Sequence, residues 1–271
     1  MKITAQTKKK LLIILPVIVI MIVGAIFFLN KNKNTDKIAE PTTTKKKVQS
    51  PVNVIPVSER PYLRLEPSAD GHYITMVIEE VKKPATQLEY EMEYQTGSML
   101  QGFGGLIKLG QLPVSEKKLF GSQSAGGAIT YHEDIKGGNL LAQFTGSEAY
   151  AVKSAWRYFT NSDKATTFSS QDTKFSITNQ SLNKYSYIII YNSPGYPGEV
   201  KGELLSDAYT VAAEKSLKLL SSNFEVTIRS SEAGQMMGYD GSKWQKIDST
   251  YENGVVKATA PLMDVYLLVK N

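Results

Sequence analysis

The segment Leu11–Leu29 contains no charged side chain over nineteen residues, and lysines flank it on both sides. As a helix rising about 1.5 Å per residue it would span about 28 Å, close to the hydrocarbon thickness of a bilayer. Pro16 and Gly24 are compatible with a membrane helix. The alternative is a signal peptide cleaved after Ala25, but the apolar residues continue to Leu29, where a mature N-terminus would turn polar. The segment therefore predicts a retained transmembrane helix over 11–29.

The lysines around this helix give its orientation only weakly. Lys8–Lys10 precede it, and three further lysines follow it at 31, 33 and 37, so the positive-inside count is nearly balanced. Because residues 1–10 are too few to form a domain, we expect them to be a cytoplasmic tail. The prediction is a single-pass, signal-anchor protein of the cell membrane, with the lipid bilayer as the partner of 11–29 and the bulk of the chain extracytoplasmic.

Residues 30–58 are rich in Lys, Asn, Thr and Pro and have neither a helical nor a strand period. This composition predicts a disordered linker between the membrane and the folded part. Its lysines are compatible with a solvated stalk and also with contacts to anionic lipid headgroups, and the sequence leaves both open.

The basic charge of the chain is concentrated at its N-terminal end. Residues 1–59 carry ten lysines and three acidic side chains, a net charge of +7, whereas the whole chain carries +5. Residues 60–271 therefore carry a net charge of −2. Because nucleic-acid binding needs a basic face on the folded domain, this balance predicts no nucleic-acid partner.

The chain contains no cysteine, which excludes disulfides, thiolate catalysis, cysteine zinc sites and a lipobox anchor. An extracytoplasmic domain without disulfides must be stabilised by its own core. This is common in bacterial envelopes, so we expect a bacterial protein. No His/Asp cluster and no calcium-binding loop pattern is present, and we expect no metal and no cofactor.

The first half of the remaining chain is predicted to be a β-sandwich over 59–160. Short runs with partial period-2 alternation are separated by Gly, Pro, Asn or Ser clusters about ten residues apart. These runs lie at 73–81, 87–94, 105–110, 138–144 and 150–159. In QLEYEMEY (87–94), apolar side chains point one way and glutamates the other, so this strand has one buried and one wet face in an antiparallel sheet. Trp156 is a candidate core anchor.

A polar segment at 160–167 predicts the boundary to a second β-sandwich over 168–271. Its strand-like runs lie at 174–179, 185–192 and 223–230. Asp240-Gly241 and Asn253-Gly254 predict tight hairpin turns. Only 207–222 has a short helical period, and its leucines at 217, 219 and 220 are equally compatible with a strand and turn. The predicted fold is thus mainly β: an N-terminal transmembrane helix, a linker and two tandem antiparallel β-sandwich domains.

The C-terminal hairpins resemble those that close bacterial surface β-sandwich modules, including Ig-like and ZU5-like ones, in which a Tyr/Trp–Asp-Gly hairpin precedes two apolar strands. The matching residues are Tyr239, Asp240, Gly241, Trp244, Val256, Ala258, Tyr266, Leu267 and Val269. The whole layout also resembles uncharacterised membrane-anchored surface proteins of small-genome bacteria. The resemblance covers about 35 residues specifically; it implies a fold and a location, and it transfers no catalytic residue.

The stretch LFGSQSAGGAITYHED (119–134) places Ser124 in a pattern close to a hydrolase nucleophile elbow, with His132 and Asp134 following. The Gly pair and the β-branched residues after it instead predict a turn and a return strand. Ser124 would then lie about 20 Å from His132, and Ser122 about 13 Å. We therefore predict a hairpin with a polar tip at 122–127, an exposed His132 on a wet sheet face, and a contact site at Ser122, Ser124 and His132.

Three other patterns have a functional and a structural interpretation. GFGG (102–105) lacks the helix and lysine of a phosphate loop, so a bulge or turn is expected. The many glutamates fit a solvated sheet face, although a glycosidase pair needs no sequence adjacency. YSYIIIYNSPGYPG (185–198) groups tyrosines, of which Tyr191 and Tyr196 are candidates for an exposed binding platform; core tyrosines are the alternative.

These patterns predict a membrane-anchored, extracytoplasmic binding or structural module of the bacterial cell envelope, without catalysis of its own. The expected partner is an envelope protein or glycan. Two alternatives remain open: a hydrolase of envelope glycans or peptides, and an accessory subunit of a surface pilus or secretion complex.

Overall fold

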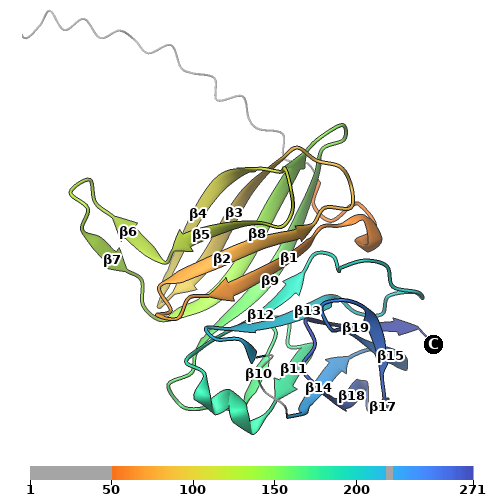
Figure 1. The fold of residues 1–271 in the computed structure, drawn as a ribbon. Helices are drawn as coiled ribbons and strands as arrows, with labels where there is room; N and C mark the ends of the chain where they lie inside the picture. Colours follow the sequence, from red (N-terminus) through yellow and green to blue (C-terminus); the bar gives the residue numbers. More distant parts are fainter. Residues whose placement is uncertain (1–50, 218–221, 271) are drawn as a thin grey trace, which may run out of the picture. The chain divides into compact units, whose positions relative to one another are not determined.

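The computed structural model describes residues 51–217 and 222–270, which lie in one compact unit (Figure 1). The predicted cytoplasmic tail and the predicted transmembrane helix over 11–29 fall outside these residues. Within the described part, no helix combines the length and the apolar character that crossing a membrane requires.

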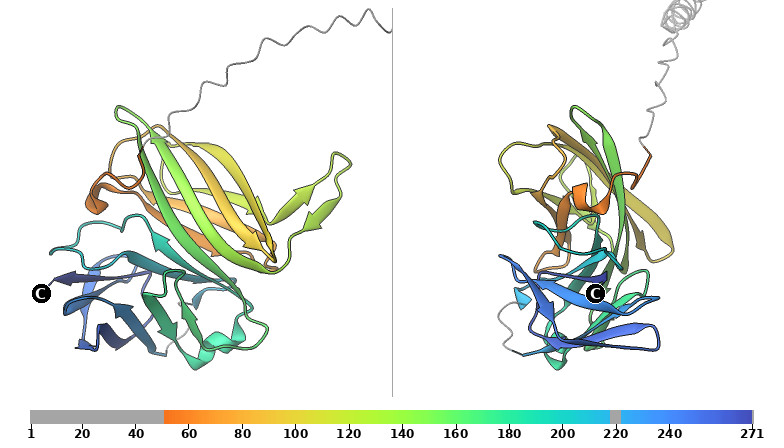
Figure 2. Two further views of the ribbon diagram at one scale, coloured as in Figure 1. Left: turned by 180° about the vertical axis from the view of Figure 1, so that it is seen from behind. Right: turned by 90° about the vertical axis from the view of Figure 1, so that its right-hand side faces the viewer.

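The described residues form a mainly β, sandwich-like fold, as predicted, and it contains nineteen strands. A nine-stranded sheet has the order β16 (Trp244–Ile247), β15 (Gly234–Tyr239), β19 (Val265–Lys270), β13 (Ala208–Ala213), β12 (Tyr187–Ser193), β9 (Tyr150–Thr160), β8 (Ile135–Thr145), β3 (Gln87–Thr96), β4 (Met99–Lys108). Neighbouring strands in it are antiparallel. Figure 2 shows it from behind, with β3, β4, β8 and β9 side by side.

Two smaller sheets cover parts of the nine-stranded sheet, and a hairpin stands apart from them. One sheet has the order β1 (Tyr62–Pro67), β2 (Tyr73–Glu80), β5 (Val114–Leu119). The other has the order β10 (Thr167–Ser169), β11 (Phe175–Thr178), β14 (Phe224–Arg229), β18 (Val255–Ala260), β17 (Ser249–Glu252). The hairpin pairs β6 (Gly121–Gln123) with β7 (Ile129–Tyr131), and two short 3₁₀ helices lie at Val57–Glu59 and Gln180–Lys184.

The first core lies between the three-stranded sheet and β3, β8, β9 and β12. Leu63, Leu65 and Ile78 from the small sheet pack in the same cluster as Tyr90 and Trp156. Trp156 is fully buried, so its predicted role as a core anchor is confirmed. The β3 strand alternates buried apolar residues with exposed or partly exposed glutamates along most of its length, which confirms the two-faced strand predicted at 87–94.

The second core lies between the five-stranded sheet and the opposite face of the nine-stranded sheet. Phe175, Phe224 and Val226 pack there against Tyr209 and Tyr266. A third, smaller cluster covers the reverse side of β19, where β1 and the segment after β12 contribute Tyr62 and Tyr196. The two smaller sheets therefore pack on opposite faces of the nine-stranded sheet, one in each half.

The β12 strand belongs to both large cores. Ile189 and Tyr191 face the first core, while Ile188 and Ile190 face the second. Alternate side chains of a strand point to opposite faces, so a strand covered on both faces has a continuous apolar sequence rather than an alternating one. This explains the YIIIY run at 187–191.

The two predicted sandwiches are not separated by a linker. Strand β9, the last of the first half, pairs directly with β12 of the second half, from Tyr187–Thr160 to Tyr191–Trp156. The segment predicted as a boundary at 160–167 is a connection inside one compact unit, because the sheet continues across it. The prediction of two tandem domains is thus corrected to two halves that share a sheet.

Of the linker predicted over 30–58, residues 30–50 lie outside the described residues, and residues 51–58 are part of the folded unit. Asn53 donates its backbone N–H to the carbonyl of Ala151 at 2.9 Å, and its side chain bonds both backbone groups of Lys153. Val52 forms a parallel bridge with Ala151. Val52 and Asn53 are therefore attached to β9, Arg60 bonds the carbonyls of Asn53 and Ile55, and a 3₁₀ helix begins at Val57, so the prediction of disorder was wrong for 51–58.

Other local predictions have mixed outcomes. The Asp240-Gly241 and Asn253-Gly254 turns are confirmed, with positive φ at Gly241, Asn253 and Gly254. GFGG lies inside β4 with an unbroken register, so the bulge was wrong: a Cβ on Gly105 would lie 2.8 Å from the Tyr90 ring, which packs across it. The start of 207–222 forms β13 rather than a helix.

Candidate functional site

The hairpin predicted around Ser124 is confirmed, and it projects from the sheets in Figure 1. Ser122 and Ser124 are both exposed. Ser124 lies in the turn, where its N–H donates to the carbonyl of Ala128 and its own carbonyl accepts from Gly127, each at 2.9 Å. Ser122 pairs with Thr130, so both serines lie nearer to His132 along the strand than the sequence suggested.

His132 is partly buried rather than exposed on a wet face. Its Nδ1 lies 2.8 Å from the hydroxyl of Tyr94, and burial raises the pKa of that hydroxyl to about 12. Asp134 has a positive φ and forms an ion pair with Lys136. Because the imidazole is held by Tyr94 and the acid by Lys136, the geometry does not assemble a Ser-His-Asp triad.

Tyr191 and Tyr196 do not form an exposed platform. Tyr191 is fully buried, and its hydroxyl lies 2.9 Å from that of Ser154. Tyr196 is 4% exposed and lies under the ammonium of Lys82, 4.0 Å from the ring centroid. The platform prediction was wrong because the apolar run that contains Tyr191 is covered on both faces of the sheet.

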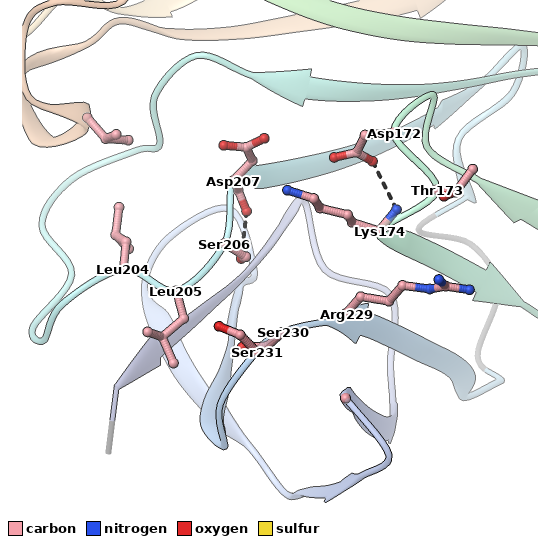
Figure 3. A pocket seen from close by; sticks show the side chains of 12 residues that line it. Asp172, Thr173, Lys174, Leu204, Leu205, Ser206, Asp207, Arg229, Ser230 and Ser231 are labelled. Carbon is pink, nitrogen blue, oxygen red and sulfur yellow. Dashed lines mark hydrogen bonds between the residues drawn. The ribbon is translucent and has the colours of Figure 1, made fainter.

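Two adjoining cavities of about 710 and 450 Å³ form a polar cleft beside the turn 170–174. They share Asp172, Lys174 and Asp207, of which Figure 3 shows Lys174 extending towards Asp207. Both cationic and anionic side chains line this cleft; Arg229 lines the larger cavity and Arg60 the smaller one.

Asp172 is held by four hydrogen-bond donors. Its Oδ1 accepts from the Ser170 hydroxyl and from the Lys174 N–H at 3.0 Å; its Oδ2 accepts from the Tyr209 hydroxyl at 3.1 Å and from Asn192 Nδ2 at 3.2 Å. Burial raises the pKa of the Asp172 carboxyl, but these hydrogen bonds outweigh burial and leave the pKa below its ordinary value. The group is therefore a carboxylate at neutral pH.

Asn192 links this carboxylate to a second one. Its Nδ2 also lies 3.5 Å from Oδ2 of Asp207, so the two carboxylate oxygens lie within about 7 Å of each other, each in hydrogen-bond reach of one nitrogen. Asn192 Oδ1 is buried without a hydrogen-bond partner in the described part of the chain. These hydrogen bonds connect the 170–174 turn to the start of β13, and we call the cluster the clasp.

A third cavity, of about 860 Å³, lies on the outer side of β15, β16 and β19. We call it the lysine–aromatic pocket. Met237, Tyr239 and Trp244 form its apolar part, and Lys201, Lys243, Lys246 and Lys270 line it as well. This is a local concentration of positive charge on a folded region whose net charge is slightly negative.

The Trp244 ring in this pocket is partly exposed and fixed in orientation. Its Nε1–H donates to the carbonyl of Pro197 at 2.8 Å, and its ring packs against Tyr239 and Tyr196 at centroid distances of 5.4 and 6.0 Å. The segment that contains Pro197 is itself held by β2, because Gly198 bonds Glu80 at 2.8 Å. The ring is thus preorganised.

The turn that carries Lys243 is also held in one conformation by hydrogen bonds. The Asp240 carboxylate accepts from the N–H groups of Ser242 and Lys243 at 2.8 and 2.9 Å, and from the Ser242 hydroxyl at 2.7 Å. These bonds, first the one from Lys243, hold the pKa of the Asp240 carboxyl well below its usual range. Lys243 therefore projects from a rigid hairpin.

Three of the lysines form no ion pair in the described part of the chain, although Glu199 also lines the cavity. Lys270 forms ion pairs with Glu232 at 3.2 Å and Glu203 at 4.0 Å. Lys201, Lys243 and Lys246 are exposed and form no ion pair within 51–217 and 222–270. They are the positive charges available to a ligand.

Sequence reasoning missed both the polar cleft and the lysine–aromatic pocket. SKWQK (242–246) places Trp244 and Lys246 on one face of a strand by simple alternation, which was a usable signal. SKWQK alone does not indicate the segment 197–202, which completes the pocket and lies about forty residues earlier in the chain.

The chain matches no family model and no curated protein at a significant level.

Proposed function

We propose that the chain is a binding module of the bacterial cell envelope without catalysis of its own, and that the lysine–aromatic pocket is its ligand site. In this proposal residues 11–29 anchor the chain in the cell membrane with the N-terminus cytoplasmic, and residues 51–270 lie outside the cytoplasm.

One observation supports the binding role above the others: a fixed, partly exposed Trp244 beside three lysines that form no ion pair in the described part. A rigid aromatic surface binds with little loss of conformational entropy, and nearby unpaired charges give orientation and specificity. The site has the composition of a ligand pocket, and no catalytic group is required to explain it.

Retention of envelope material by the full-length chain tests this proposal. The chain, solubilised in detergent and immobilised, is incubated with a wall-polymer fraction of bacterial envelopes, and the retained material is quantified. We expect retention by the wild type and a decrease of at least about tenfold for Lys243→Glu/Lys246→Glu, because both substitutions reverse charge at the pocket.

Lys108→Glu/Lys184→Glu is the matched control, since it changes the same charge at two exposed lysines far from the pocket. It should retain envelope material like the wild type. Equal losses for both double variants would show that net charge, rather than the pocket, determines binding. Protease treatment of intact cells tests the orientation: protection of residues 51–270 would contradict the extracytoplasmic location.

A second candidate function is hydrolysis of envelope glycans or peptides, and the observation in its favour is the pair Asp172 and Asp207 in the polar cleft. Their separation is compatible with a pair of catalytic carboxylates. Against it, a general acid needs a raised pKa, whereas that of Asp172 is lowered. Release of reducing ends or peptide fragments by the wild type, abolished in Asp207→Asn, would support hydrolysis; no release would rule it out.

A further inference from the structure

We infer that the lysine–aromatic pocket binds an acidic glycan, with a sugar ring stacked on Trp244 and its carboxylate or phosphate group bound by Lys243 and Lys246. This inference rests on the proposed binding function and names its ligand class.

The strand register gives the relative positions of the ring and the charges. On β16, Trp244 and Lys246 are two residues apart and on one face, so their Cα atoms lie about 7 Å from each other. Trp244 pairs with Tyr239 and Lys246 with Met237 on β15. A pyranose ring on Trp244 therefore places a charged substituent, about one ring width away, within reach of the Lys246 ammonium.

The remaining lining residues fit sugar hydroxyls. Ser242 and Gln235 line the same cavity; Gln235 Nε2 and the Ser242 hydroxyl donate within the protein, so Gln235 Oε1 and Ser242 Oγ are the acceptors that can face sugar hydroxyls. Lysine is a point charge on a flexible stem, which accepts a carboxylate or a phosphate without the fixed fork geometry of arginine. The combination of one aromatic face, neutral polar groups and mobile cations is suited to an acidic sugar.

The acidic residues around the pocket disfavour a continuous polyanion. Glu199 lines the cavity, and Glu203 and Glu232 flank it through their ion pairs with Lys270. A nucleic acid strand carries a charge at every residue and would be repelled by these carboxylates. A glycan whose acids are separated by neutral hydroxyls would not.

Tryptophan fluorescence of the full-length chain in detergent gives a direct readout. The chain has two tryptophans, and Trp156 is fully buried in the first core, so a ligand-induced change arises at Trp244. The probes are a tetrasaccharide of alternating glucuronate and N-acetylglucosamine, its neutral methyl ester and a phosphorylated mannan fragment, with an oligodeoxynucleotide as the competing class. We expect saturable quenching by the glucuronate tetrasaccharide or the phosphomannan, about tenfold weaker binding of the methyl ester, and weakening by salt.

Three variants make the result specific. In calorimetry, Trp244→Ala should reduce affinity about tenfold or more and Trp244→Phe should retain most of it, because stacking needs only a ring. Lys243→Glu/Lys246→Glu should abolish binding of the acidic probes, and Lys108→Glu/Lys184→Glu should not.

The outcomes separate the inference from the proposed function. If envelope material is retained through the pocket but neither acidic probe binds, or if the oligodeoxynucleotide binds more tightly, the glycan inference is overturned and the binding function stands. If the pocket variants retain envelope material like the wild type, the proposed function itself fails. Equal affinity for the acidic probe and its methyl ester would overturn the role of the lysines.

Discussion

The turns at 68–73 and 170–175 follow the same plan in the two halves of the unit. In each, a serine hydroxyl donates to an aspartate two residues later, and that aspartate accepts an N–H two residues further on. Each serine Oγ also accepts the N–H of the residue that starts the next strand, Tyr73 or Phe175. The sequences SADGHY and SQDTKF share only the serine, the aspartate and a final aromatic residue.

The surroundings of the two aspartates differ. Asp70 is exposed and its bonds stay within its own turn, whereas Asp172 also accepts from Tyr209 and Asn192. The same local motif therefore serves as a solvent-exposed turn in one half and as part of an interstrand clasp in the other. Local sequence determines the turn, and the tertiary context determines what the turn does.

The likeness extends to strand order. Strands β1, β2 and β5 are neighbours in one small sheet, just as β10, β11 and β14 are neighbours in the other. In each half, the hairpin between the second and third of these strands, β3–β4 or β12–β13, belongs to the nine-stranded sheet. The second half then adds β15 to β19, and the lysine–aromatic pocket lies on those additional strands. The strands that distinguish the second half from the first are thus the strands that carry the proposed site.

Substitutions in β12 should have the largest effect, because this strand belongs to both cores. Ile189→Ala and Ile190→Ala remove side chains from opposite faces, and each should lower the free energy of unfolding by about 2–5 kcal/mol. Denaturant unfolding of the full-length chain, followed by the fluorescence of Trp156 and of Trp244, measures this decrease in the free energy of unfolding. Both reporters should shift together; separate transitions would show that the halves fold independently.

Asp172→Asn and Asp70→Asn compare the two turns directly. Loss of the charge weakens four hydrogen bonds at Asp172, so we expect a destabilisation of about 2–3 kcal/mol, against about 0.5–1 kcal/mol at Asp70, where the bonds are exposed. Thermal unfolding of both variants measures this. Equal destabilisation in the two variants would mean that the hydrogen bonds from Tyr209 and Asn192 contribute nothing to stability.

Acid should reduce the stability difference between the wild type and Asp172→Asn. The pKa of Asp172 is lower in the folded protein than in the unfolded chain, where it is about 3.9, so the unfolded state binds more protons in acid. The stabilisation is present above about pH 4 and is lost as the pH falls through the lowered pKa. The stability difference between wild type and Asp172→Asn should therefore shrink from pH 7 to about pH 2; a constant difference would contradict the assignment.

The projecting hairpin should give the smallest effect. Ser122→Ala and Ser124→Ala replace exposed side chains outside all three cores, so each should change the free energy of unfolding by less than about 0.5 kcal/mol. Denaturant unfolding measures the change. A larger loss would show that the serine hydroxyls support the fold.

Local patterns predicted the features that depend on a few neighbouring residues. Alternation in 87–94 predicted β3, and the Asp-Gly and Asn-Gly pairs predicted two turns. The structure differs where distant segments meet: β12 is covered on both faces because the sheet of β1, β2 and β5 packs on one face and the sheet that contains β11 and β14 on the other. Tyr191 and Trp244 show the same limit, since burial of one and exposure of the other depend on partners remote in sequence.

The attachment of Val52 and Asn53 protects an edge of β9 from pairing with another chain. Strand β12 pairs with β9 only from Trp156 to Thr160, so the same edge would otherwise present free backbone groups nearer the start of β9. Val52 bridges Ala151 there, and Asn53 bonds Ala151 and Lys153. Because an unpaired strand edge is a template for aggregation, this short segment covers a region where a second molecule could add a strand.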